Sequence, residues 1–94
     1  MKILSCEEIK NFVKNGGKLI DVRTQPEFEQ ARLPGSVRMS AHELTTPPFS
    51  PDDQVYLYCR TGSRSGVAEH FLRDMGYNVT NIGGVVHYLS CLQY

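Results

Sequence analysis

The chain of 94 residues lacks several features that would place a protein in a functional class at once. It has no tryptophan, only three cysteines and no net charge, with ten acidic and ten basic side chains. Balanced charge argues against broad electrostatic capture of nucleic acid or of an anionic membrane. No apolar run approaches the length of a transmembrane helix, and no apolar signal core follows Met1. We therefore expect a cytoplasmic protein without nucleic-acid or membrane partners.

The cysteines are too few and too far apart for a zinc site or a dense disulfide framework. They are Cys6, Cys59 and Cys91, whereas structural zinc sites take paired ligands only a few residues apart. We expect all three thiols to be reduced. Cys6 and Cys91 are interpreted as structural residues near the start of the first helix and the end of the last. Neither a metal nor another cofactor is expected.

Helix and strand signals alternate along the chain, which is long enough for one small domain over residues 1–94. Three capping-box pairs, Ser5 with Glu8, Thr24 with Glu27 and Ser40 with Glu43, predict helix starts. Alternation of strands with helices predicts a parallel sheet that is covered on both faces. The predicted strands are 18–22, 37–39, 55–58 and 77–82. The predicted later helices are 65–75 and 85–92. The apolar positions of helix 65–75 are expected in the core: Val67, Ala68, Phe71, Leu72 and Met75.

The most informative segment surrounds Cys59. An apolar strand-like run, residues 55–58, delivers this cysteine into the loop Arg60-Thr61-Gly62-Ser63-Arg64, and a helical pattern follows at once. A cysteine at the carboxyl end of a strand lies where open α/β sheets bind their ligands. Gly62 permits positive φ, so the loop can curl with its amides inward. The helix that follows, from Ser63 or Ser65, adds unpaired amides and the positive end of its dipole.

These surroundings favour a negative charge on the sulfur of Cys59. Together with Arg60 and Arg64 they can lower a cysteine pKa from about 8.5 to roughly 3.5–7.5. Because the thiolate is the nucleophilic form, we predict Cys59 as the catalytic residue and the two arginines as substrate-binding residues. The alternative is an inert cysteine buried at the end of an apolar strand, which the flanking arginines disfavour. The remaining members of the predicted active-site loop are Thr61, Gly62, Ser63 and Ser65.

Four features in chain order resemble a single-domain rhodanese. They are the segments LIDVR at 19–23, PEF at 26–28 with RLPGS at 32–36, CRTGSRS at 59–65, and GG at 83–84. The third is the most specific, because it is similar to the family's C-R-x-G-x-R-S active-site loop. The resemblance covers residues 3–92. It implies a three-layer α/β/α fold with a central five-stranded parallel sheet, and a cysteine that carries sulfane sulfur as a persulfide.

The chain departs from the family's pattern at two places. The family usually has G-H-I-P-G-A where this chain has residues 31–36, and the family's common tryptophan after the double glycine corresponds to Tyr88. Neither change lies in the cysteine loop. The departures therefore leave the rim of the site, and with it the identity of the substrate, open.

The resemblance implies a thiosulfate sulfurtransferase that works in two steps. The Cys59 thiolate attacks the sulfane sulfur of a donor such as thiosulfate, and sulfite leaves. An acceptor such as cyanide, a small thiol or a protein cysteine then takes the sulfur. Arg60 and Arg64 hold the anionic donor, and the inward amides of the loop stabilise the persulfide. No cofactor takes part.

Two charged residues at the end of the first predicted strand are given supporting roles. Asp21 and Arg23 invite roles as acid or base, yet attack by a thiolate requires no proton removal. We interpret Asp21 as a structural acceptor that braces the loop. Arg23 is expected to form an ion pair with Glu27 or Glu29.

Three other functions compete with sulfur transfer by an enzyme. A cysteine phosphatase or arsenate reductase needs an arginine six positions after the cysteine, where this chain has Ser65; Arg64 comes one residue early. The shorter loop suits one sulfur atom rather than a tetrahedral anion. A non-enzymatic interaction module would keep the fold alone, and the presence of Cys59 argues against it. A sulfur carrier that passes persulfide sulfur between proteins stays open from the sequence.

Overall fold

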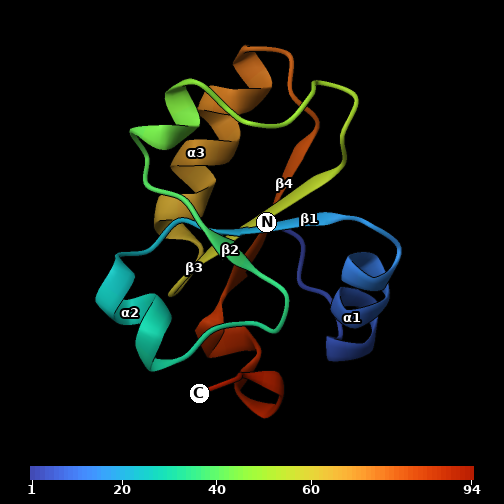
Figure 1. Ribbon diagram of the computed structural model, residues 1–94, viewed down its shortest axis with the longest axis vertical. Helices are drawn as coiled ribbons and strands as arrows, with labels where there is room; N and C mark the ends of the chain where they lie inside the picture. The colour runs from blue at the N-terminus through green and yellow to red at the C-terminus, as the bar shows by residue number, and fades with distance from the viewer.

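Helices and strands alternate along residues 1–94, all of which the computed structural model describes (Figure 1). The principal elements are α1 (Cys6–Lys14), β1 (Lys18–Asp21), α2 (Gln25–Gln30), β2 (Val37–Arg38), β3 (Val55–Cys59), α3 (Ser63–Asp74) and β4 (Val79–Gly84). Short 3-10 helices occupy Glu43–Thr45, Val85–His87 and Leu89–Cys91. None of the helices has the length and apolar character needed to span a membrane.

Capping boxes begin α1 and α2, as the sequence predicts. The Glu8 amide donates to Ser5 Oγ at 3.0 Å, and the Ser5 amide donates to Glu8 Oε1 at 2.9 Å. Thr24 and Glu27 form the same reciprocal pair before α2. Each box satisfies two backbone donors that have no partner inside the helix.

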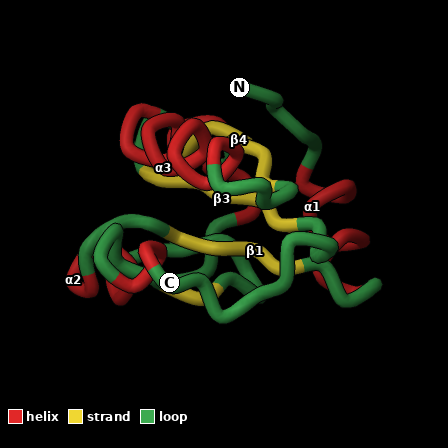
Figure 2. Tube along the Cα trace, turned by 90° about the horizontal axis from the view of Figure 1, so that it is seen from above, coloured by secondary structure: helices red, strands yellow, loops and turns green.

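The sheet has the strand order β2-β1-β3-β4, and every pair is parallel. All five residues of the central strand β3 are buried. Side chains alternate between the faces of a strand, so Val55 and Leu57 pack against Leu72 of α3, whereas Tyr56 and Tyr58 pack on the opposite face with Ile9 of α1. Figure 2 shows α3 on one side of the strands and α2 on the other. The predicted α/β fold with a sheet covered on both faces is confirmed.

The strand count and the last helix differ from expectation. The sheet has four strands instead of five, because the N-terminal segment shares only one backbone hydrogen bond with β4, from the Lys2 amide to the Asn81 carbonyl oxygen at 2.8 Å. One bond does not make a strand ladder. The helix predicted over 85–92 is broken into two 3-10 helices. Between them Tyr88 has φ −132°, and its buried side chain donates a hydrogen bond to the Ile82 carbonyl oxygen at 2.6 Å.

The expectation of three reduced thiols is wrong. Cys6 and Cys91 form a disulfide across a sequence separation of 85 residues, and Cys59 is the one free cysteine. The start of α1 and the last 3-10 helix pack on the same face of the sheet, where Ile9 and Cys91 belong to one apolar cluster. This packing joins the two cysteines, and their spacing in the sequence gives no sign of it.

We expect the Cys6–Cys91 disulfide to contribute about 2–4 kcal/mol to the free energy of unfolding, because a crosslink that closes a long loop restricts the unfolded chain. The double variant Cys6→Ser, Cys91→Ser should lose that amount in urea unfolding. Reductant should destabilise the unaltered protein equally and leave the variant unchanged. In denaturant, the unaltered chain should react with one equivalent of iodoacetamide before reduction. Three reactive thiols without reductant would contradict the pairing.

Candidate functional site

The free cysteine lies at the carboxyl end of β3, under the loop that leads into α3. Cys59 is 1% exposed. Its Sγ accepts hydrogen bonds from the Gly62 amide at 3.1 Å and from Ser65 Oγ at 3.4 Å. The helix begins at Ser63, the earlier of the two expected starts, so the positive end of its dipole lies close to the sulfur.

The donors around Cys59 favour its ionised form. Burial raises the pKa of the Cys59 thiol, but hydrogen bonds from the Ser65 hydroxyl and from the amides of Ser65, Gly62 and Thr61 outweigh it, and the pKa is lowered from its ordinary value. A thiolate gains more from these bonds than a neutral thiol does. The hydroxyls of Thr61 and Ser63 contact each other at 3.2 Å and are exposed. Neither hydroxyl donates a hydrogen bond to Cys59.

Two glycines allow the loop to lie against β4. Gly62 has φ +101°, in the left-handed region that favours glycine. A Cβ on Gly84 would overlap the carbonyl group of Arg60, so the end of β4 and the loop are in direct backbone contact. The Val86 amide donates to the Arg60 carbonyl oxygen at 3.2 Å. The loop is therefore held from the β4 side as well as from β3.

Asn81 of β4 is the residue that the sequence analysis missed. Its side chain is buried and joins three parts of the site. Asn81 Nδ2 donates to the Gly62 carbonyl oxygen at 2.9 Å. Its Oδ1 accepts from Ser65 Oγ at 2.7 Å and from the Gly83 amide at 3.0 Å. The sequence held one signal for this residue: it is a polar side chain inside a predicted strand, two residues before a double glycine.

The two loop arginines differ in their surroundings. Arg60 is exposed, and its guanidinium makes no hydrogen bond or ion pair with the rest of the chain. Arg64 donates from Nη1 and Nη2 to the two carboxylate oxygens of Glu27 at 2.9 and 3.0 Å. The hydrogen bonds from Arg64, opposed by burial and aided by bonds from Thr24, lower the pKa of Glu27 to about 2. Arg64 thus ties the start of α3 to α2.

Asp21 and Arg23 pair with each other, in contrast to the expected pairing of Arg23 with Glu27 or Glu29. Arg23 Nη2 lies 2.7 Å from Asp21 Oδ2, and both side chains are buried. The same guanidinium donates to the carbonyl oxygen of Ala31 at the end of α2. A buried carboxylate needs such a partner close by. Asp21 accepts no hydrogen bond from the cysteine loop, so this pair joins the end of β1 to α2.

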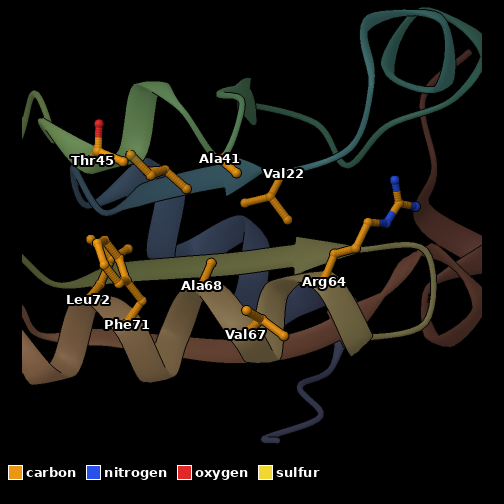
Figure 3. A pocket seen from close by; sticks show the side chains of 9 residues that line it. Val22, Ala41, Thr45, Arg64, Val67, Ala68, Phe71 and Leu72 are labelled. Carbon is orange, nitrogen blue, oxygen red and sulfur yellow. The ribbon is translucent and has the colours of Figure 1, made fainter.

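An apolar pocket of about 440 Å³ lies beside the loop, between α3 and the segment around the 3-10 helix Glu43–Thr45. Figure 3 shows Arg64 at one end, with its guanidinium directed away from Val67, Ala68 and Phe71. Val67, Phe71 and Met75, expected in the core, are 72%, 46% and 44% exposed. Only part of the predicted stripe on α3 faces the sheet. Cys59 does not line this pocket.

Fold and site together define an α/β protein with a free cysteine at a strand end, surrounded by hydrogen-bond donors. No cluster of three His, Cys, Asp or Glu side chains is placed to hold a metal ion. Such a site is suited to nucleophilic attack by sulfur and to stabilising an anionic sulfur species.

Comparison with known proteins identifies the family. The model of the rhodanese-like domain matches residues 5–90, and the chain belongs to this family. It is 33% identical over 72 residues to a sulfurtransferase of Allochromatium vinosum, covering 72% of this chain and 67% of that protein. It is 35% identical over 96 residues to the adenylyltransferase and sulfurtransferase UBA4 of Meyerozyma guilliermondii, covering 85% of this chain and 22% of that protein.

Among solved structures, the chain resembles the reduced CoADR-RHD of Bacillus anthracis with a TM-score of 0.82 and 31% identity. The match covers 100% of this chain and 18% of that one. This chain therefore spans about a fifth of the length of two of these three proteins. The predicted resemblance to a rhodanese is confirmed.

Ser65→Ala should raise the pKa of Cys59, because it removes the hydroxyl that donates to the sulfur while leaving the backbone amides in place. A higher pKa means less thiolate at mildly acidic pH. The rate of iodoacetamide reaction there should fall about tenfold and recover at high pH.

The matched control for this test is Ser63→Ala, which removes an exposed hydroxyl from the same helical turn. It should not change how the iodoacetamide rate depends on pH. Equal profiles for Ser65→Ala and the unaltered protein would show that the hydroxyl does not stabilise the thiolate.

Proposed function

We propose that this protein transfers sulfane sulfur through a persulfide on Cys59, from an anionic donor such as thiosulfate to a thiophilic acceptor. One observation carries the proposal: the single free thiol lies at a strand end with the Gly62 amide and the Ser65 hydroxyl both donating to its sulfur. These donors favour a thiolate before attack and an anionic persulfide after it.

In the first step, the Cys59 thiolate attacks the outer sulfur of thiosulfate. A bond forms between the cysteine sulfur and that sulfur, the sulfur–sulfur bond of thiosulfate breaks, and its electron pair leaves with sulfite. No proton needs to move. The product is an anionic persulfide, whose terminal sulfur lies one bond further out than Sγ.

In the second step, an acceptor attacks the terminal sulfur of the persulfide. Cyanide leaves as thiocyanate, and a thiolate, from a small molecule or from a protein cysteine, leaves as a new persulfide. The electron pair of the broken bond returns to Cys59 as thiolate. The cysteine is thus regenerated without a cofactor.

The arginines have the charge and the position to bind the donor. Arg60 carries an unpaired, exposed guanidinium next to the cysteine. Arg64 is 46% exposed and paired with Glu27. A sulfonate that binds Arg64 therefore has to share the guanidinium with the Glu27 carboxylate or displace that carboxylate. Thiosulfate carries its sulfonate away from the sulfur under attack, and a cation at that end holds the donor and the departing sulfite.

The length of the loop supports sulfur transfer over phosphate chemistry. The position of a phosphatase arginine is held by Ser65, which is buried and bonded to Asn81. The inward donors therefore close around one sulfur atom. Turnover of p-nitrophenyl phosphate by the unaltered protein would favour the phosphatase class instead.

Cys59→Ser should abolish sulfur transfer and leave the urea unfolding curve in place, because a hydroxyl fits the site but is a far weaker nucleophile. Intact mass after incubation with thiosulfate should show one added sulfur on the unaltered protein, removable by reductant, and none on the variant. A loaded protein that passes sulfur only to a protein thiol, with no turnover to cyanide, would indicate a sulfur carrier. Absence of the added sulfur would contradict the proposal.

Arg64→Ala should lower kcat/KM for thiosulfate by roughly tenfold to a hundredfold, the range expected for one charge-assisted hydrogen bond. Discharge of a preformed Cys59 persulfide to neutral dithiothreitol should change much less, because that step holds no anionic donor. Steady-state kinetics and single-turnover discharge on the same variant give the comparison.

Glu27→Gln separates the two roles open to Arg64. It removes the ion pair with α2 but keeps the cation, so it should not lower kcat/KM for thiosulfate. If it lowers the value as Arg64→Ala does, Arg64 braces α2 rather than binding the donor. Lys18→Ala, at the far end of β1, controls for the loss of one positive charge.

A further inference from the structure

Asn81 connects the three segments that enclose the sulfur of Cys59. Its side chain reaches the loop through the Gly62 carbonyl oxygen, the first turn of α3 through Ser65 Oγ, and the end of β4 through the Gly83 amide. The residue is 4% exposed. Its backbone is held too, since its amide donates to Glu69 Oε2 at 2.6 Å. All of its polar side-chain atoms are therefore used within the site.

The Ser65 hydroxyl has one proton and three acceptors within reach. Asn81 Oδ1 lies at 2.7 Å, whereas Cys59 Sγ and the Gly83 carbonyl oxygen both lie at 3.4 Å. While the sulfur is a neutral thiol, the Ser65 hydroxyl donates its proton to the nearest acceptor, Asn81 Oδ1. An anionic sulfur is the stronger acceptor, because hydrogen bonds to ions are stronger than neutral ones. Ionisation of Cys59 thus turns the O–H of Ser65 from Asn81 Oδ1 toward the sulfur.

We propose that Asn81 is the positioning residue of this site: its amide holds the Gly62 loop in place and orients the Ser65 hydroxyl between two settings, one for a neutral and one for an anionic sulfur. Asn81 contacts neither donor nor acceptor and acts through Gly62 and Ser65. The proposal rests on the proposed function only in that the anionic sulfur includes the persulfide. The thiolate alone is sufficient to test it.

Charged and titratable groups lie near the site on each neighbouring element, and none of them is mutated in the test below. His87 lies closest to the end of β4, where its Nδ1 accepts from the Gly84 amide at 3.0 Å. A Cys59→Ser control separates any pH response of these groups from that of the cysteine. The groups are Arg60 of the loop, Arg64 and Glu69 of α3, Asp21 at the end of β1, Arg23 after β1, Glu27 of α2, and His87 after β4.

The first measurement needs no change at Asn81. In the unaltered protein, the side-chain amide resonances of Asn81 should shift with pH at the midpoint of Cys59 ionisation, read from its Cβ resonance. The exposed Asn78 should show no such shift, and Cys59→Ser should abolish the shift at Asn81. An Asn81 amide that does not follow Cys59 would overturn the proposal, and this measurement decides it even if every Asn81 variant fails to fold.

The second measurement is a double-mutant cycle on the iodoacetamide rate at mildly acidic pH. Ser65→Ala should reduce that rate about tenfold in the unaltered protein but less than threefold in an Asn81→Ala background, because the hydroxyl is no longer oriented there. In an Asn78→Ala background the full effect should remain. An undiminished Ser65→Ala effect beside Asn81→Ala, with lowered stability, would mean that Asn81 is only structural.

Neither measurement uses a sulfur donor, so each is independent of the proposed transfer. If thiosulfate adds no sulfur to Cys59 while the Asn81 amide follows its ionisation, the proposed function fails and the positioning role stands. If sulfur is added but the amide is insensitive to Cys59, the reverse holds.

Discussion

The structure depends on one constraint, which is the stabilisation of a charged sulfur at a place where almost no water reaches. Cys59 is 1% exposed, and burial by itself opposes the thiolate. The Gly62 amide and the Ser65 hydroxyl reverse that preference by donating to the sulfur. These donors are effective only while the loop and the first turn of α3 keep their positions. Much of the surrounding structure serves to fix those positions.

The support comes from elements on three sides. β3 places the cysteine, β4 contacts the loop through Gly84 and holds it through Asn81, and the Arg64–Glu27 pair joins α3 to α2. On the face of the sheet that α1 covers, the Cys6–Cys91 disulfide joins α1 to the segment that follows β4. That segment donates the Val86 amide to the Arg60 carbonyl oxygen. The disulfide and the cysteine loop are thus connected through one short stretch of backbone.

Local signals in the sequence were sufficient for the main elements and for the strand, loop and helix start around Cys59. Capping boxes located α1 and α2, and the apolar run before Cys59 located β3, because each signal acts within one turn or one strand. Three assignments depended on distant packing and failed. Val67 and Phe71 share an apolar stripe with Leu72 yet lie at the surface. Arg23 pairs with Asp21, which is nearer than Glu27 or Glu29. Cys6 and Cys91, expected to be reduced, form a disulfide.

What the sequence by itself determined is the local geometry of the cysteine loop: a cysteine, a glycine that accepts positive φ, and a helix start lie within seven consecutive residues. Their chemistry follows from local backbone geometry, which a short segment encodes. Only the tertiary structure decided which distant groups complete it. Asn81 is 22 residues from Cys59, and Cys6 is 85 residues from its disulfide partner Cys91. Such contacts arise from the order of parallel strands and the packing of both sheet faces, and no periodicity along the chain records them.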